Sequence, residues 1–277
     1  MSPHPLDPPA NRALLEQFVQ HFQLELPSDP FRSLAQVAAA FSRLPYENLS
    51  KVLRYHDART PAGAREQPQD IVAGHLRWGT GGTCFSLTAT LLHLVRTLGI
   101  SAQPILADRS YGSDTHCALV TWLDGAPYLI DPGFLLVQPV RLPTTSPAQV
   151  VTPVQDVVLV PQQNGERIEL WTPGSASRPR LTFKTSPVDD AEFLQAWDAS
   201  FDWDMMHYPV LTRVDETQQR YLRAGYHQVR DRSGVQRTEF REEELPTVIA
   251  REFGIDASVV RRALEVLRRA GHSARPT

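Results

Sequence analysis

The spacing of the apolar residues changes about a third of the way along this 277-residue chain. Before residue 100 they recur every three or four positions, which is the spacing of one helix face, as in Leu14, Leu15, Phe18, Val19 and Phe22. After residue 100, short stretches of apolar and β-branched residues alternate with Pro, Gly and Asp-Gly turns, as strands do. The sequence therefore predicts a helical first third followed by an antiparallel sheet or small barrel.

The pattern also predicts individual elements. We expect helices over residues 11–22, 33–41 (with Ser33 as N-cap), 70–77, 87–98, 189–199, 242–253 and 256–270, and a loop over 55–68. We expect strands over residues 102–107, 115–123, 127–131, 136–140, 148–160, 167–172, 180–184, 210–214, 220–224 and 226–230. These elements suggest one compact unit of three regions: residues 1–100 helical, 101–188 a β-barrel, and 189–277 an α/β lid.

The net charge and the cysteine content of the chain limit which binding partners and which cellular compartment we expect. A net charge of -3 gives no electrostatic reason to expect nucleic acid or an anionic membrane as partner. No stretch approaches the roughly 20 apolar residues of a membrane span, and the N-terminus has no apolar signal-peptide core. Two cysteines, Cys84 and Cys117, make no disulfide framework. We therefore expect a cytoplasmic protein with no nucleic-acid or membrane partner.

Cys84 lies where the glycine-rich segment 79–82 enters a predicted helix. A helix N-terminus and a nearby imidazole both stabilise a thiolate. Gly81 and Gly82 would let backbone N–H groups turn toward the sulfur or a bound oxyanion. This arrangement suggests a nucleophile, although a lone cysteine is more often a small buried hydrophobe.

A predicted hairpin provides the partners that a cysteine nucleophile needs. If Asp124-Gly125 is a two-residue loop, residue 123 pairs with 126 and 118 with 131. His116 and Asp131 are then diagonal neighbours on one face of the hairpin. The sequence therefore predicts a base and its orienting carboxylate, although a structural histidine and a turn at Asp131 are the plainer alternatives.

The other motifs in the sequence are weaker indications of a functional site. The segment 79–82 lacks the Gly-Lys-Ser/Thr of a phosphate-binding loop, and no histidine or cysteine spacing indicates a metal site. Cys117 faces away from His116 and is interpreted as core filler. The cluster of Asp202, Asp204 and His207 is a surface helix or loop, or alternatively a lid over an acceptor pocket. The run 242–244 favours a helix N-terminus.

Five segments in this order resemble the arylamine N-acetyltransferases over nearly the whole chain. They are Leu44-Pro-Tyr-Glu-Asn-Leu49, Gly81-Gly-Thr-Cys-Phe85, Thr115-His116, Tyr128-Leu-Ile-Asp-Pro-Gly-Phe134, and Glu243-Glu-Leu leading to Phe253-Gly-Ile255. The resemblance implies an α+β fold: a helical N-terminal region, an antiparallel β-barrel in the middle, an α/β C-terminal lid and a cysteine-protease-like catalytic core.

The resemblance also implies a ping-pong acyl transfer with Cys84, His116 and Asp131 as catalytic residues. An acyl group would pass from a thioester, acetyl-CoA or another acyl-CoA, through Cys84 to an arylamine or hydrazine. The substrate-binding residues that it implies are Phe134, Gly133, Phe85 and Tyr46. Both partners would be small molecules, with no permanently bound cofactor and no metal.

The chain departs from the family at two informative positions. Thr80 replaces the arginine of the Arg-Gly-Gly motif, so Glu47 needs another partner, for which Arg77 is the candidate. Leu135 replaces a glycine in the turn that approaches the coenzyme's phosphates. These changes leave three alternatives open: an amide synthase with a non-CoA donor, a transglutaminase-like cysteine hydrolase, and a binding protein that keeps the fold.

Overall fold

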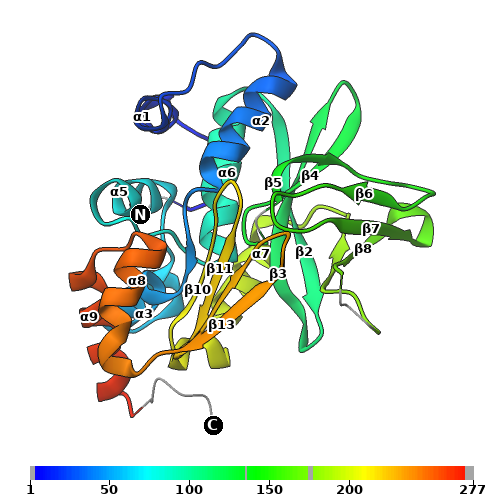
Figure 1. The fold of residues 1–277 in the computed structure, drawn as a ribbon. Coiled ribbons are helices and arrows are strands. Elements are labelled where there is room, and N and C mark those ends of the chain that lie inside the picture. The colour runs from blue at the N-terminus through cyan, green and yellow to red at the C-terminus, as the bar shows by residue number, and fades with distance from the viewer. Residues whose placement is uncertain (1–3, 135, 174–176, 272–277) are drawn as a thin grey trace.

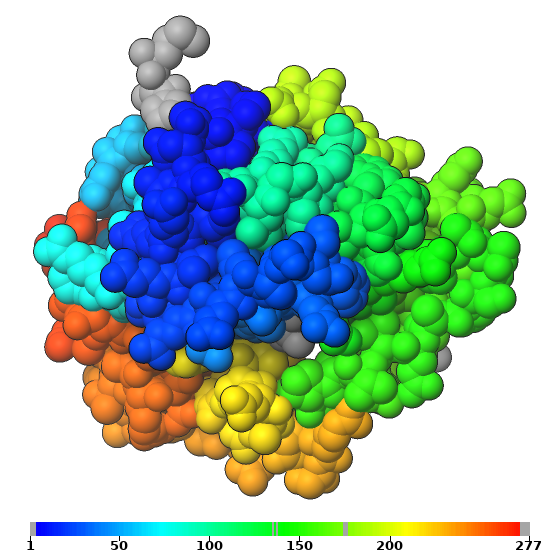
Figure 2. Space-filling model, turned by 90° about the horizontal axis from the view of Figure 1, so that it is seen from above, coloured from blue at the N-terminus to red at the C-terminus, as the bar shows by residue number. Residues whose placement is uncertain are grey.

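The computed structural model describes residues 4–134, 136–173 and 177–271. It is a mixed α+β fold with N-terminal helices, a nearly closed antiparallel β-barrel and C-terminal helices. Figure 1 shows the barrel on one side of the molecule, helices α8 and α9 on the other, and a second sheet between them. From above, the N-terminal helices lie across the top of the molecule, between the barrel and the C-terminal part (Figure 2).

The helices are α1 (Ala13–Phe22), α2 (Pro30–Phe41), α3 (Leu49–Ala58), α4 (Pro61–Ala64), α5 (Pro68–Trp78), α6 (Cys84–Thr97), α7 (Asp190–Ala199), α8 (Leu245–Phe253) and α9 (Ala257–Arg269). The strands of the barrel are β2 (Ser101–Arg109), β3 (Gly112–Leu123), β4 (Ala126–Asp131), β5 (Leu136–Arg141), β6 (Ala148–Val150), β7 (Val157–Gln162), β8 (Arg167–Trp171) and β9 (Leu181–Lys184). The second sheet contains β1 (Tyr46–Glu47), β10 (Val210–Val214), β11 (Gln219–Arg223), β12 (Tyr226–Arg230) and β13 (Val235–Glu239).

Helix α6 is the central helix of the molecule. It is buried on nearly all sides and contacts α2, α5 and the barrel strands β2 and β3. A helix enclosed in this way needs small or apolar residues around its whole circumference, which is the composition of this segment. The N-terminus of α6, where Cys84 lies, is therefore held rigidly inside the protein.

Two predictions for the helical part are wrong. Helix α2 begins at Pro30, not at Ser33, because Asp29 caps it by accepting a hydrogen bond from the backbone N–H of Arg32 at 2.7 Å. The predicted loop over 55–68 contains the end of α3 and the whole of α4. Most of α3 is polar, and its buried face includes Lys51, so its apolar periodicity is weak.

The barrel sheet has the strand order β5-β4-β3-β2-β9-β8-β7-β6, with antiparallel neighbours. The two-residue loop predicted between β3 and β4 is confirmed, because Leu123 pairs with Ala126. Asp124 and Gly125 have φ values of 49° and 75°, the left-handed conformation that a type I′ turn requires. The register of this hairpin sets the positions of His116 and Asp131.

The strand predicted over 148–160 is instead a hairpin of β6 and β7, in which Val150 pairs with Val157. The connecting loop contains Pro153, which has no N–H to donate to a neighbouring strand.

The second sheet joins distant parts of the sequence. Strand β1 pairs with β10, with Tyr46 opposite Thr212 and Glu47 opposite Leu211. The first third is therefore not purely helical, and strand β13 was not predicted. Within the described part of the chain, no helix has the length and apolar character needed to cross a membrane.

Candidate active site

Cys84 is the first residue of α6 and is almost completely buried. The two glycines before it do not point their N–H groups at the sulfur. The Gly81 N–H donates to Glu47 Oε1 at 3.2 Å, and the Gly82 N–H donates to the carbonyl oxygen of Pro45 at 3.3 Å. These glycines therefore fix the loop against the segment 45–47. The expectation that N–H groups here turn toward the sulfur is wrong for these two residues.

Glu47 is satisfied without an arginine. Its carboxyl group also accepts hydrogen bonds from the backbone N–H and the hydroxyl of Ser50, at 3.0 and 2.7 Å. Burial raises the pKa of this carboxyl group above its ordinary value. Arg77, the partner suggested from the sequence, lies over the ring of Trp78 instead.

His116 and Asp131 meet inside the protein. Nε2 of His116 donates to Oδ2 of Asp131 at 2.8 Å, and neither side chain is exposed. Oδ1 of Asp131 accepts from the backbone N–H of Phe134 at 2.8 Å, which fixes the carboxylate. Burial alone would lower the pKa of His116, but the charge and hydrogen bond of Asp131 outweigh it and raise this pKa.

Gly133 allows the turn after β4 to approach both Cys84 and His116. A Cβ atom at this position would lie 2.8 Å from Cys84 Cβ and 2.8 Å from His116 Cε1. Only a glycine fits this approach without displacing a neighbour. The structure therefore brings Cys84, His116 and Asp131 together, as the sequence predicts.

The surroundings of Cys84 stabilise its thiolate. A hydrogen bond from Cys117 contributes most to lowering the pKa of Cys84 well below its ordinary value. A hydrogen bond and positive charge at His116 and the charge of Arg109 lower it further, against the opposing effect of burial. Cys117 is a core residue, as expected, but it also contacts Cys84 and lies 3.4 Å from the hydroxyl of Thr88.

Arg109 was missed in the sequence. Its Nη2 atom lies 3.0 Å from Nδ1 of His116, the ring nitrogen that does not contact Asp131. Because arginine can only donate, this contact favours the tautomer in which Nε2–H points to Asp131. Ala107 pairs with His116 across β2 and β3, but the register shifts before Arg109, which pairs with Gly112. The position of Arg109 therefore depends on an irregularity of the sheet that the sequence does not signal.

A cavity of about 610 Å³ opens beside these residues. We call it the aromatic cavity, because its walls include Tyr46, Tyr111, Phe134, Trp203, Tyr208 and Tyr221. Gly133 and Arg109 also line it. Of the expected substrate-binding residues, Phe85 is not at this surface. It is fully buried and contacts the rings of Phe193, Trp197 and Trp203.

The segment from Trp203 to Tyr208 forms one wall of the aromatic cavity, which favours the lid interpretation of the Asp202–His207 cluster. Asn48 holds this segment. Its side-chain amide donates to the carbonyl oxygens of Met205 (2.5 Å) and Tyr208 (2.8 Å) and accepts from the N–H of Val210 at 2.8 Å. This role of Asn48 was not visible in the sequence.

A second hollow of about 440 Å³ lies next to the aromatic cavity and shares Arg109, Tyr111 and Phe134 with it. We call it the basic groove, because Arg178, Arg180 and Arg230 also line it and no Asp or Glu is among its described lining residues. Leu135, whose substitution was expected to affect donor binding, lies outside the described residues.

Comparisons with known proteins agree on one family. A family model described as N-acetyltransferase matches residues 31–262. No curated protein sequence matches the chain.

Among solved structures, an arylamine N-acetyltransferase from Mycobacterium abscessus has a TM-score of 0.77 at 19% identity, covering 92% of this chain and 94% of that chain. The arylamine N-acetyltransferase of Mycobacterium marinum, in complex with CoA, has a TM-score of 0.75 at 16% identity, with coverages of 92% and 98%. An arylamine N-acetyltransferase from Bacillus cereus, described with a Cys-His-Glu catalytic triad, has a TM-score of 0.70 at 16% identity, with coverages of 88% and 98%.

Proposed function

The chain belongs to the arylamine N-acetyltransferase family, and from this premise we propose that it moves an acetyl or other acyl group from a thioester donor to an arylamine or hydrazine nitrogen. Cys84 is the acyl carrier, His116 the general base and acid, and Asp131 the residue that orients His116. Acetyl-CoA is the first donor to test.

One observation carries this proposal. A thiol with a strongly lowered pKa lies beside an imidazole that is itself held by a buried carboxylate at 2.8 Å. Structural cysteines in apolar surroundings have a raised pKa, so the environment of Cys84 favours a reactive thiolate. The same arrangement disfavours a binding protein that merely keeps the fold.

In the first half of the reaction, Nδ1 of His116 gives up the hydrogen bond that it accepts from Arg109 and receives the proton of Cys84. The thiolate attacks the carbonyl carbon of the donor thioester. The bond between that carbon and the donor sulfur then breaks, and His116 returns the proton to the departing thiolate. Asp131 stabilises the imidazolium between these two steps, because it accepts the hydrogen bond from Nε2.

In the second half, the amine nitrogen attacks the carbonyl carbon of acyl-Cys84 and gives its proton to His116. The carbon–sulfur bond to Cys84 breaks, which releases the amide and restores the thiolate. The amine must arrive uncharged to attack, so weakly basic arylamines and hydrazines react at neutral pH. The rings that line the aromatic cavity suit a flat aromatic acceptor.

The basic groove supports an acyl-CoA as donor. Arginine side chains without acidic neighbours attract phosphate groups, and this groove adjoins the aromatic cavity. The solved Mycobacterium marinum relative is a complex with CoA. A carrier-bound thioester is the alternative donor, because it also bears a phosphate on its pantetheine arm.

The proposal is tested by the intact mass of the protein after brief exposure to acetyl-CoA without amine, beside Cys84→Ser. We expect an acetyl increment in the wild type alone, discharged when an arylamine is added. If no increment forms but Cys84 still alkylates quickly, acetyl-CoA is not the donor and the amide-synthase alternative takes precedence. Thioester turnover without added amine would indicate the hydrolase.

A further inference from the structure

We propose that Asp108 is a positioning residue for the acyl transfer: its carboxylate holds an irregular part of the β2–β3 hairpin, and the shape of this hairpin places Arg109 against His116. The inference rests on the reaction proposed above and adds to it a residue that lines neither the aromatic cavity nor the basic groove. It follows from two separate sets of contacts, one made by Asp108 and the other by Arg109.

The register of the β2–β3 hairpin shifts next to the active site. Ala107 pairs with His116, and Arg109 pairs with Gly112. One residue of β2 therefore lies opposite three residues of β3. We call residues 107–116 the hairpin bulge. A bulge bends a strand and changes the direction of nearby side chains, so the position of Arg109 relative to His116 depends on how this bulge is held.

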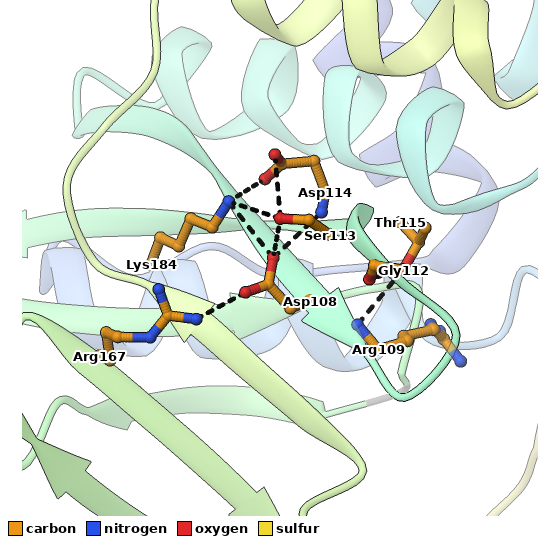
Figure 3. Close-up of polar contacts among 8 residues, drawn as sticks. All are labelled: Asp108, Arg109, Gly112, Ser113, Asp114, Thr115, Arg167 and Lys184. Carbon is orange, nitrogen blue, oxygen red and sulfur yellow. Dashed lines mark hydrogen bonds and ion pairs between the residues drawn. The ribbon is translucent and has the colours of Figure 1, made fainter.

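Figure 3 shows Asp108 at the centre of a cluster of polar contacts in the hairpin bulge. Its Oδ1 atom accepts hydrogen bonds from the Ser113 hydroxyl at 2.8 Å and from the Asp114 N–H at 3.1 Å. Its Oδ2 atom accepts from Arg167 of β8 at 2.5 Å, and Nζ of Lys184 in β9 lies 3.3 Å from Oδ1. One carboxylate therefore ties the hairpin bulge to two other strands of the barrel.

The hairpin bulge contains a backbone conformation that needs this support. Asp114 has a φ of 56°, in the left-handed region that few residues other than glycine adopt. Its N–H is held by Asp108, and its carboxylate by Lys184 at 2.5 Å. Burial opposes the ionisation of Asp108, but the hydrogen bonds that it accepts outweigh this effect and lower its pKa to about 2. Asp108 is therefore ionised at neutral pH and holds the strained residue in place.

The side chain of Arg109 points away from this cluster, as Figure 3 also shows. Its Nη2 atom lies 3.0 Å from Nδ1 of His116, while its Nε atom is buried without a hydrogen-bond partner. In the described part of the chain, no carboxylate forms an ion pair with its guanidinium group. Its own N–H donates to Thr115 Oγ1 at 3.3 Å, inside the hairpin bulge. The backbone of the bulge, rather than an ion pair, therefore sets where Arg109 points.

The position of Arg109 bears on the reaction because its charge acts on the thiol of Cys84. A hydrogen bond from Cys117 contributes most to lowering the pKa of Cys84. The contacts of His116 and the charge of Arg109 lower it further. Other titratable groups near these residues come from separate elements: Asp131 of β4, Tyr111 of the β2–β3 turn, Tyr46 of β1 and Lys51 of α3. They stay in place when Arg109 alone moves, so displacement of its guanidinium group raises the pKa of Cys84.

Asp108 has a direct and an indirect effect on Cys84, and the two have opposite signs. Removal of a negative charge by itself favours the thiolate and lowers the pKa of Cys84. Loss of the support for Arg109 raises it instead. We expect the midpoint of iodoacetamide alkylation against pH to move upward by about one unit in Arg109→Leu and by a smaller amount in Asp108→Ala. A downward shift in Asp108→Ala, or none, would overturn the proposal.

A double-mutant cycle shows whether the effect passes through Arg109. In the Arg109→Leu background, Asp108→Ala should produce no further upward shift, and equal upward shifts in both backgrounds would overturn the proposal. Ser113→Ala weakens the network without changing a charge. It should shift the midpoint upward only where Arg109 is present, and it replaces Asp108→Ala if that variant does not fold.

Glu252→Ala is the matched control. It also removes a carboxylate that binds an arginine, with a side-chain exposure of 19% against 23% for Asp108, and it should leave the midpoint unchanged. Alkylation needs no acyl donor, so it tests Asp108 even if no acetyl-Cys84 forms, in which case the acyl-transfer proposal fails alone. Where acetyl-Cys84 does form, the pH profile of acylation in Asp108→Ala should move upward with that of alkylation. An unchanged acylation profile would refute the positioning role.

Discussion

The carboxyl group of Glu47 lies 3.2 Å from the backbone nitrogen of Gly81, and this contact joins the second sheet to the loop that precedes Cys84. The two segments are so close that a Cβ atom on Gly81 would lie 1.8 Å from the carbonyl oxygen of Pro45. One buried carboxyl group therefore positions the loop through the hydrogen bonds that it accepts from Ser50 and Gly81. Burial raises the pKa of Glu47, and the hydrogen bonds that it accepts from Ser50 and Gly81 oppose this effect.

We therefore expect Glu47→Gln to be less damaging than Glu47→Ala. Glutamine keeps the oxygen that accepts from Gly81 and from the Ser50 hydroxyl, but its amide NH2 group replaces the oxygen that accepts from the Ser50 N–H. Alanine leaves all three donors without a partner. The alanine variant should lose about 1–3 kcal/mol of unfolding free energy for each buried group left unpaired. Urea unfolding measures the difference, and equal stability of the two variants would contradict this account.

Cys117→Ala should raise the pKa of Cys84, because the hydrogen bond from Cys117 contributes most to lowering it. A raised pKa means less thiolate at mildly acidic pH, so the midpoint of iodoacetamide alkylation against pH should move upward. Cys117→Ser keeps a donor and should shift the midpoint less. If wild type and Cys117→Ala have the same midpoint, the thiolate is stabilised by His116 and Arg109 without Cys117.

The part of the active site that could be predicted from the sequence is determined by residues that are close together in the chain. An Asp-Gly turn fixes the loop length between two strands, and the loop length fixes which residues face each other. That is why His116 and Asp131 could be placed together from the sequence. Helix α6 was equally predictable, because its stripe of leucines continues for several turns.

The remaining features depend on contacts between distant segments. Asn48 contacts residues about 160 positions away, and nothing in its own neighbourhood indicates that partner. Arg109 was missed because its position follows from the register of β2 on β3, which no turn motif sets. Likewise, Glu47 was assigned to Arg77 by charge alone, whereas neutral donors at Ser50 and Gly81 satisfy it.

Gly133→Ala should slow acylation of Cys84 by about a hundredfold, the scale of loss when reacting groups are displaced by about 1 Å. The added methyl group would lie 2.8 Å from carbon atoms of both Cys84 and His116, so one of them must move. Gly234→Ala is the matched control, because a Cβ atom there meets nothing within 4 Å. The mass increment from acetyl-CoA, followed over time, gives both rates. Similar rates in the two variants would show that the approach of Gly133 is not needed.

Glu66 should make the protein less stable as the pH rises. Burial raises its pKa in the folded state to about 8, from an ordinary value of 4.5. Between these two values the unfolded chain loses a proton that the folded protein retains, so folding becomes less favourable as pH increases. In Glu66→Gln this contribution is absent. Urea unfolding at pH 5 and pH 8 should therefore show a smaller loss of stability in Glu66→Gln than in wild type, and parallel losses would place the raised pKa elsewhere.

Asn48→Ala should weaken acceptor binding more than donor binding. Its side chain holds Met205, Tyr208 and Val210, and the segment that contains the first two forms a wall of the aromatic cavity, away from the basic groove. Without the amide, two carbonyl oxygens and one N–H lose their partner, and the wall is no longer fixed. We expect a several-fold rise in the KM for the arylamine with little change in that for acetyl-CoA.

Asn48→Asp keeps the acceptor for Val210 but not the two donors, so it should resemble the alanine variant. An equal rise in both KM values would mean that the segment also shapes the path of the donor.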